Sequence, residues 1–373
     1  MYIKSVKLKN FRNYSDLDIS FSENVNVIYG ENAQGKTNIL EAIFLCASGR
    51  SHRTSRDMDL VRINGNNYYI KIDYKREVEE KTLEIIFDKE GKKKIRINEI
   101  PVRKLGDLIG NINAVMFSPE DLMIIKEGPS ERRRFIDITL SQIKPTYFYD
   151  LQQYAKILLQ RNNLLKEIRI KPRLSDTLDV WNEHLINTGT KIMLLRAAFL
   201  KRLNEKAVNK HESLTGNKEE LLIKYSPSIK VNDYSDRESI EKEFRKVLNY
   251  SKNKEIIKGT TMYGPQRDDY EIFLNEMNIK LYGSQGQQRT AVLAVKLAEV
   301  DIMREETGEY PLLLLDDVMS ELDLVRQGFL FENINSVQTF ITCTDKEILK
   351  NKKLEHIKYI EIKNGKLENN QII

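Results

Sequence analysis

The chain has 373 residues, of which 40% are hydrophobic and 31% charged, so it has ample material for buried cores and is long enough for two or three domains. Its net charge is only +5, which permits nucleic-acid binding without arguing for it strongly. No apolar run is long enough to span a membrane, and the first residues lack the apolar core of a signal peptide. We therefore expect a cytoplasmic protein with buried, reduced thiols at Cys46 and Cys343.

The first 125 residues are rich in predicted strands. They fall at residues 2–8, 17–21, 25–29, 68–74, 81–87 and 94–97. We expect these strands to form a mixed sheet, with the helix predicted at residues 38–45 packed beneath it.

A phosphate-binding loop lies between the strand at 25–29 and the helix at 38–45. It follows the pattern G-x-x-x-x-G-K-[ST] and consists of Gly30, Glu31, Asn32, Ala33, Gln34, Gly35, Lys36 and Thr37. Backbone N–H groups and the helix dipole create an anion site there. Lys36 is placed to reach the β- and γ-phosphates, and the Thr37 hydroxyl to coordinate Mg²⁺. The loop predicts a protein that binds a nucleoside triphosphate, ATP in the first instance.

The middle of the chain is predicted to be almost wholly helical. Between about residues 130 and 249, apolar residues recur at spacings of three, four or seven, and Pro145, Pro172 and Pro227 punctuate the pattern. An inserted helical lobe or short arm fits best. We expect an α/β ATPase head split into residues 1–125 and 251–373, with a helical lobe at 126–250.

An apolar strand at residues 312–315 ends in two carboxylates. Asp316 is expected to hold Mg²⁺, and Asp317 to polarise the attacking water as a general base. Acidic turns after strands are common, so this motif alone is weak evidence for a metal site. It becomes strong evidence together with the phosphate loop upstream. Beyond it, residues 320–323 predict a helix N-cap with the helix opening at Leu322 or Asp323, or a loop that crosses a dimer interface.

A third motif, with Ser284, Gly286 and Gln287, precedes a helix predicted at residues 290–303. It is either a second anion site that serves the ATP of another protomer or an ordinary helix N-cap. One chain rarely needs two γ-phosphate sites for one nucleotide, which favours the shared site.

These three motifs occur in the order found in ABC-type ATPases of the SMC class, which the opening at residues 7–14 also resembles. Four further segments resemble the RecF family of bacterial recombination mediators: residues 49–54, 117–122, 128–135 and 264–269. The resemblance implies an ABC/SMC-type head with nucleotide contacts from Arg12 and Asn13. It also implies an ATP-dependent homodimer in which Ser284, Gly286 and Gln287 touch the partner's ATP and Asp323 lies nearby.

The resemblance further implies the activity and the partners. Such proteins are slow, DNA-stimulated ATPases that bind DNA at single-strand gaps and at junctions between single and double strands. With RecO and RecR they help to load RecA in gap repair and in the SOS response. Three positions depart from the broader ABC pattern: Asp317 replaces a glutamate, residues 117–120 replace a glutamine loop, and Thr344-Asp345 replaces a histidine switch.

Basic residues supply candidate DNA contacts. Arg132, Arg133 and Arg134 are consecutive, so a helix would spread them over most of its circumference, and one of them is expected to pair with a carboxylate. Arg50 and Arg53 lie with His52 and Arg56 soon after the first helix, where they would engage DNA, sense nucleotide or neutralise an acidic patch. A lysine-rich hairpin tip at residues 91–96 is a further candidate or simply a solvated turn.

Two other function classes remain open from the residues. One is a transporter-type ATPase coupled to a membrane partner, which the helical insert and the RecF-like segments disfavour. The other is a P-loop kinase for a small molecule, which would leave the motif at residues 284–287 without a use.

Overall fold

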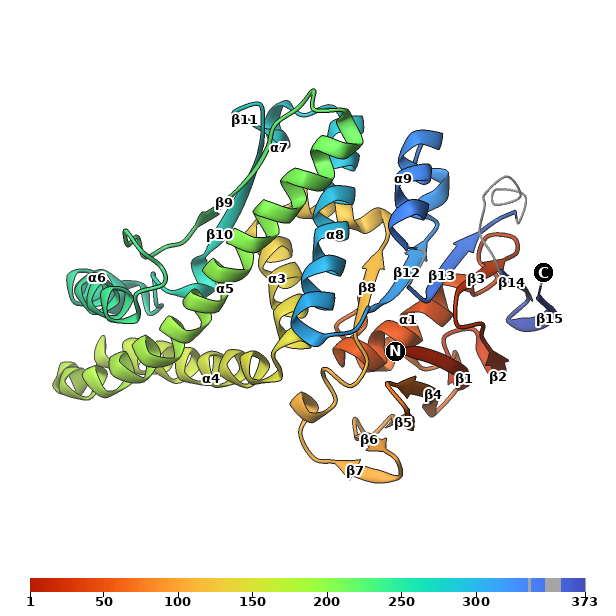
Figure 1. Ribbon diagram of the computed structural model, residues 1–373. Coiled ribbons are helices and arrows are strands. Elements are labelled where there is room, and N and C mark those ends of the chain that lie inside the picture. Colours follow the sequence, from red (N-terminus) through yellow and green to blue (C-terminus); the bar gives the residue numbers. More distant parts are fainter. Residues whose placement is uncertain (335–336, 346–356, 373) are drawn as a thin grey trace. The chain divides into compact units, whose positions relative to one another are not determined.

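The computed structural model describes residues 1–334, 337–345 and 357–372 (Figure 1). Contacts divide the chain into two compact units. Unit 1 comprises Met1–Leu122 and Lys296–Ile373, and unit 2 comprises Met123–Val295. Unit 2 extends beyond residue 250, where the sequence placed the end of the helical lobe, because β10 (Asp269–Leu274) pairs with β9 (Leu221–Ser226).

Unit 1 contains an antiparallel sheet with the strand order β2-β1-β4-β5-β6-β7. Its strands are β1 (Tyr2–Phe11), β2 (Tyr14–Ser20), β4 (Asn67–Arg76), β5 (Glu79–Asp88), β6 (Lys93–Ile97) and β7 (Ile100–Val102). β4 alternates buried with half-buried positions, so only one face of the sheet joins the core.

The second sheet of unit 1 is mixed and has the strand order β15-β14-β3-β13-β12-β8. Its strands are β3 (Val25–Tyr29), β8 (Ala114–Phe117), β12 (Leu312–Asp316), β13 (Thr339–Cys343), β14 (Lys358–Lys363) and β15 (Lys366–Ile372). Neighbouring strands are parallel except for the pair β14–β15. The sequence predicted one mixed sheet for the first 125 residues. In the structure the antiparallel strands pair only with one another, and of the first 125 residues only β3 and β8 join the parallel strands from the end of the chain.

Helix α1 (Lys36–Ser48) is buried along almost its whole length, including every position from Ile39 to Ala47. It packs on β8, β12 and β13 of the mixed sheet. A helix that is buried on nearly every side needs cover on nearly every side, and the mixed sheet supplies part of that cover. The expectation of buried free thiols is confirmed for Cys46 and Cys343.

Unit 2 is mainly helical. Its helices are α2 (Met123–Lys126), α3 (Pro129–Ile143), α4 (Pro145–Ile168), α5 (Leu178–Thr215), α6 (Arg237–Lys258) and α7 (Ile279–Tyr282). A small antiparallel sheet, β11-β10-β9, completes it, with β11 at Met277–Asn278. The prediction that residues 130–249 are almost wholly helical missed β9. The alternation of Leu221, Ile223 and Tyr225 in this strand is short and lies between helical segments, so it was included in the helical pattern.

A buried ion pair connects three helices of unit 2. Arg161 of α4 and Glu255 of α6 are both fully buried, with 2.7 Å between Nη2 and Oε2. Arg161 also donates to Asn182 of α5 and to Thr261. Every donor group of the guanidinium therefore has an acceptor within the helical core, as a buried charge requires.

Two helices complete the fold. Helix α8 (Gln285–Thr307) begins in unit 2 and ends in unit 1, and α9 (Leu324–Ile334) lies in unit 1. In the part of the chain that the structure describes, none of the helices has the length and apolar character needed to cross a membrane.

Candidate nucleotide site

The phosphate loop and the two carboxylates meet at one edge of the mixed sheet. The register pairs Tyr29 with Cys343 and Thr342 with Asp316, so β3, β13 and β12 end side by side. Because these strands are parallel, whatever follows each of them is delivered to the same edge. Residues separated by almost three hundred positions in the sequence thus share one site.

At this edge Thr37 and Asp316 are in direct contact. The Thr37 hydroxyl donates to Asp316 Oδ1 over 2.8 Å, and the Thr342 hydroxyl donates to the same oxygen over 2.7 Å. Burial raises the pKa of Asp316 above its ordinary value, although both hydrogen bonds act to lower it. The edge therefore holds a desolvated carboxylate whose environment favours a nearby positive charge.

The oxygens of Thr37 and Asp316 fit a magnesium ion. Both are hard oxygen donors, which Mg²⁺ prefers, and adjacent ligands of an octahedral ion with bonds of about 2.1 Å lie about 3 Å apart. The 2.8 Å between them is close to that spacing. On this geometry the hydroxyl–carboxylate pair is the candidate cation site.

The loop itself has the backbone needed to surround an anion. Gly30 and Gly35 have φ values of +150° and +113°, and a Cβ on Gly35 would meet the Asn13 amide. Asn13 donates to the Gln34 carbonyl over 2.9 Å, and Tyr14 to the Gly35 carbonyl over 3.0 Å. The hairpin between β1 and β2 thus braces the loop from outside.

Lys36 is buried within the loop. It is 4% exposed, and its ammonium donates to the carbonyls of Gly30 (2.8 Å) and Glu31 (2.9 Å). The side chain therefore already lies along the concave side of the loop, whereas Glu31, Asn32 and Ala33 are exposed at its rim.

Arg12 is held beside this loop by Glu41. Glu41 lies in α1, is fully buried and accepts two hydrogen bonds from Arg12, at 2.8 and 2.6 Å. It also accepts from the Ser51 hydroxyl over 2.5 Å. Burial acts to raise the pKa of Glu41, but the hydrogen bonds from Arg12 and Ser51 outweigh it, so the pKa lies below its ordinary value. The carboxylate is charged at neutral pH and fixes the direction of the Arg12 guanidinium.

Asp317 and Asp323 follow β12 in two different backbone states. Asp317 has a left-handed backbone, with φ of 51°, and its N–H donates to the Thr342 hydroxyl over 2.9 Å. Asp323 caps α9, because its carboxylate accepts from the Arg326 N–H over 2.9 Å. The helix begins at Leu324, so the predicted opening at Leu322 or Asp323 was wrong by one or two residues; Asp323 is the cap.

The third motif forms a capping box in unit 2. The Gln287 N–H donates to the Ser284 hydroxyl over 3.3 Å, and the Ser284 N–H donates to Gln287 Oε1 over 2.9 Å. Gln287 also donates to Glu219 over 2.8 Å. The structure therefore contains the N-cap that was the simpler reading of this motif, and Gly286 lies in the first turn of α8.

The basic residues after α1 differ in their exposure and in their contacts. Arg50 is exposed, whereas Arg53 donates to Asn38 over 3.2 Å and lies 3.8 Å from the Glu41 carboxylate. His52 is largely buried, packs edge-on against Phe44 and has its pKa lowered by that burial. Arg53 thus partly neutralises an internal acid, one of the three readings that the sequence left open.

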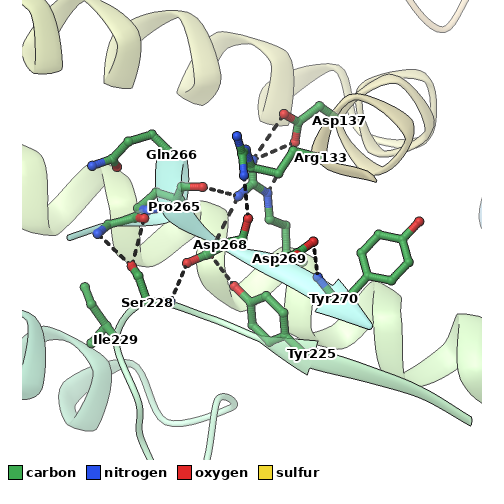
Figure 2. Close-up of polar contacts among 12 residues, drawn as sticks. Arg133, Asp137, Tyr225, Ser228, Ile229, Pro265, Gln266, Asp268, Asp269 and Tyr270 are labelled. Atoms are coloured by element: carbon green, nitrogen blue, oxygen red, sulfur yellow. Dashed lines mark hydrogen bonds and ion pairs between the residues drawn. The ribbon is translucent and has the colours of Figure 1, made fainter. Parts of the chain in front are cut away.

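Two of the three consecutive arginines are engaged inside unit 2. Arg132 is 8% exposed and donates two hydrogen bonds to the Asp269 carboxylate, at 2.7 and 2.8 Å. Arg133 donates to the Asp268 carbonyl over 2.7 Å, within the polar network that Figure 2 shows. The prediction that Arg132 contacts DNA is wrong, because its guanidinium holds α3 against β10. Arg134 is the one whose side chain is largely exposed, 3.6 Å from Glu131.

The same polar network explains the structural role of residues 264–269. Asp268, which is 1% exposed, accepts hydrogen bonds from the Tyr225 hydroxyl and the Ser228 N–H (Figure 2). Arg196 of α5 donates to the Pro265 carbonyl over 2.6 Å and pairs with Asp137 over 2.9 Å. The segment is therefore a structural joint that connects β9, β10, α3 and α5.

Sequence reasoning missed Thr342 and Glu41. Thr342 has no motif of its own, and its role appears only when β13 is placed beside β12 in parallel register. Glu41 did carry a signal, because it is an acidic residue within an otherwise apolar helical segment that was expected to be buried.

Known proteins of one family match nearly the whole chain. The family model "RecF/RecN/SMC N terminal domain" matches residues 2–367. A DNA replication and repair protein RecF from Acetivibrio thermocellus is 55% identical over 98% of this chain and 99% of its own length. One from Clostridium tetani is 46% identical over 98% of this chain and 99% of its own length.

Solved structures give the same result. A structure of the recombination mediator protein RecF with ATP, in the RecFOR pathway, covers 100% of this chain and 97% of its own, with a TM-score of 0.92 and 37% identity. An SMC head bound to a domain of ScpA is similar in fold, with a TM-score of 0.57 and 15% identity over 100% of this chain and 98% of its own. The expected ABC/SMC-type head with an inserted helical segment is confirmed.

Proposed function

The chain belongs to the RecF/RecN/SMC N-terminal domain family, and within it to the RecF proteins of DNA replication and repair; from this membership we propose that it is an ATP-dependent DNA clamp. Two copies close around two ATP molecules on gapped or junction DNA, act with RecO and RecR to load RecA, and release the DNA after hydrolysis. The contact between Thr37 and Asp316 is the observation that supports this most directly, because it joins the phosphate loop to the carboxylate strand.

In the proposed site, Lys36 and the backbone of Gly30, Glu31, Asn32, Ala33, Gln34 and Gly35 bind the phosphates. Thr37 and Asp316 hold Mg²⁺, which when bound neutralises charge that develops on the phosphate oxygens. Arg12 and Asn13 line the rim of the loop. Asp317, with its left-handed backbone beside Thr342, orients the water and accepts its proton.

Glu41 positions Arg12, and its removal is expected to weaken nucleotide binding. In Glu41→Gln the two charged hydrogen bonds to Arg12 are lost or weakened, at about 1.5–3 kcal/mol each. We expect the KM for ATP to rise about tenfold with kcat changed much less, because a rim contact binds substrate and transition state alike. Steady-state kinetics measure this, with Glu309→Gln as the control, since Glu309 pairs with Arg76 elsewhere in unit 1. An unchanged KM would make Glu41 a structural residue only.

The dimer proposal rests on exposed apolar side chains beside both motifs that would face a partner. Leu281 and Tyr282, next to Ser284, are each 69% exposed, and Leu324 and Val325, next to Asp323, are 76% and 72% exposed. Adjacent large apolar side chains at a surface are typical of a protein interface. Ser284, Gly286 and Gln287 would contact the partner's γ-phosphate, with Asp323 close to the same interface.

Ser284→Arg is expected to abolish ATP-induced dimers while ATP binding persists. The new side chain adds bulk and a charge where a partner's nucleotide would sit, whereas the lost N-cap costs only about 1 kcal/mol. Light scattering with a non-hydrolysable analogue measures the mass. Ser284→Thr keeps both hydroxyl and cap and should dimerise normally. Dimers of Ser284→Arg as stable as those of the wild type contradict the shared site.

DNA contacts are proposed for exposed arginines of each unit: Arg50 and, with its partly exposed guanidinium, Arg53 in unit 1, and Arg134 in unit 2. Arg133 is half-buried, and its bond to Asp268 makes it a weaker candidate than the sequence alone indicated. Phosphate contacts of this kind carry no sequence readout and weaken steeply as salt rises.

The proposed function is tested by measuring solution mass and affinity for a gapped duplex, with ATP or ADP, across a salt series. We expect ATP, and not ADP, to produce both the dimer and tight DNA binding. Equal DNA affinity with the two nucleotides would reject the clamp.

A further inference from the structure

A row of cationic side chains and one tyrosine winds along the exposed surface of α6. The row consists of Lys242, Lys246, Tyr250, Lys254 and Lys258, which we call the α6 stripe. Each residue is four positions from the next and lies close to it, but each step of four turns about 40° around the helix, so the row winds through about 160° from Lys242 to Lys258. All five are exposed, and Tyr250 is 81% exposed.

The rest of α6 explains why this face is turned to solvent. The helix buries Ile240, Phe244, Leu248, Ser251 and Glu255 against the rest of unit 2, and the stripe uses positions that stay exposed. Glu255 is the only acidic residue between Phe244 and Lys258, and it is fully occupied inside by Arg161. The second half of the outer face therefore has positive charge with no acidic side chain of its own to balance it.

Contacts along the stripe leave most of this charge available. Lys242, Lys254 and Lys258 form no ion pair with any residue that the structure describes, and Lys246 pairs there with the half-buried Glu243, at 3.3 Å. The Lys254 ammonium lies 5.9 Å from the centre of the Tyr250 ring. Surface pairs such as Lys246–Glu243 contribute little stability and are readily exchanged for another anion.

The positive surface continues onto the end of α4. A Cβ at Gly259, directly after α6, would lie 2.8 Å from the Lys166 side chain, so Lys166 crosses the helix end beside Lys258. Arg169, Lys171 and Arg173 follow Lys166 in the chain and are exposed. This end of the helical unit thus joins two basic segments that are far apart in the sequence.

We propose that the α6 stripe binds the phosphate backbone of DNA, an inference that rests on the proposed function and assigns it a surface. Like charges four residues apart on a helix repel one another, and a polyanion laid along the row relieves that repulsion. The stripe rises about 24 Å over its sixteen residues, a rise over which one DNA strand presents about seven phosphates, and a strand that contacts the whole row must turn around the helix with it. Lysine ammoniums and the tyrosine hydroxyl are all suitable donors to phosphate.

A nucleic acid suits this face better than a lipid surface or an acidic protein. An interfacial helix would need a row of apolar side chains beside the cations, and on this face Ile257, 69% exposed, is the only large aliphatic one that is largely exposed. A row of cations matches a charged polymer, whereas charged residues are depleted at the core of protein interfaces.

The test replaces Lys242, Lys246, Lys254 and Lys258 together by glutamine in the full-length protein. All four positions are exposed, so the fold should persist, which thermal melting checks. Binding of gapped and continuous duplex is measured with a non-hydrolysable ATP analogue across a salt series. Each lost phosphate contact should lower the slope of log K against log salt by roughly 0.7–0.9, so we expect a slope shallower by about three and an affinity lower by about two orders of magnitude at physiological salt.

A matched control separates local contacts from net charge. Lys4, Lys7, Lys71 and Lys81 replaced by glutamine remove the same charge, but each of these lysines pairs with an acid on the antiparallel sheet. This control should bind DNA within about twofold of the wild type, since long-range effects of surface charge are screened.

The outcomes separate the two proposals. If the stripe variant and the wild type share one slope and one affinity, the stripe does not contact DNA, although the clamp remains. If the wild type itself binds no DNA with ATP, both proposals fail. If the variant keeps its DNA affinity but loses binding to anionic phosphatidylserine vesicles that the wild type retains, the face is a lipid surface and the inference is overturned.

Discussion

Replacing Lys36 with alanine is expected to weaken ATP binding by at least about 100-fold. The Lys36 ammonium lies inside the phosphate loop, bonded to the carbonyls of Gly30 and Glu31, and needs only to exchange these acceptors for phosphate oxygens. Two charge-assisted hydrogen bonds contribute about 1.5–3 kcal/mol each, and every 1.4 kcal/mol is a factor of ten. Calorimetric titration with ATP measures the loss.

The same variant should lose ATP-induced dimers and tight DNA binding, because both are proposed to follow from the bound nucleotide. Lys81→Ala, which removes a half-buried lysine paired with Glu79, is the control and should behave as the wild type. If Lys36→Ala still formed dimers on addition of ATP, the nucleotide would not be the link between the two copies.

Asp317→Asn is expected to stop turnover and leave ATP binding intact. Asparagine tolerates the left-handed backbone that Asp317 adopts, so the Asp317 N–H keeps its bond to Thr342. The amide cannot accept the proton of the attacking water. Loss of a positioned general base lowers kcat by roughly 10²–10⁴-fold, which phosphate release under saturating ATP measures.

Trapping of the ATP state is the second consequence of Asp317→Asn. Because hydrolysis is proposed to release DNA, the variant should hold ATP-dependent dimers on gapped DNA longer than the wild type. Glu321→Gln removes a carboxylate four residues away and should leave turnover unchanged. Wild-type hydrolysis by Asp317→Asn would assign the base to another residue.

The strands of unit 1 show what a local sequence pattern can predict and what it cannot. Alternation and turn residues predicted the strands at 68–74, 81–87 and 94–97 close to their observed bounds. They did not predict that these strands exclude β3 and β8, which pair with strands from the end of the chain. Pairing partners depend on which faces the helix α1 covers, and that is a property of the assembled unit.

For the three consecutive arginines, too, local spacing did not predict the partners. Their spacing predicted only that they point in different directions. Arg132 has a partner, Asp269, that lies far along the chain and comes close only because β10 packs against α3. Whether a cation is a surface group or an internal brace is decided by which carboxylate the fold brings within reach.

The sequence by itself determined the identity of the site. A glycine loop between a strand and a helix needs only local geometry to form an anion site, and the order of the motifs was enough to indicate the family. The tertiary structure alone decided what completes that site, with Thr342 beside Asp316 and Glu41 behind Arg12, and it alone decided that the α6 stripe is exposed to solvent. The physical reason is that hydrogen bonds and ion pairs between distant residues depend on strand register and helix facing, which the packing of the whole unit fixes.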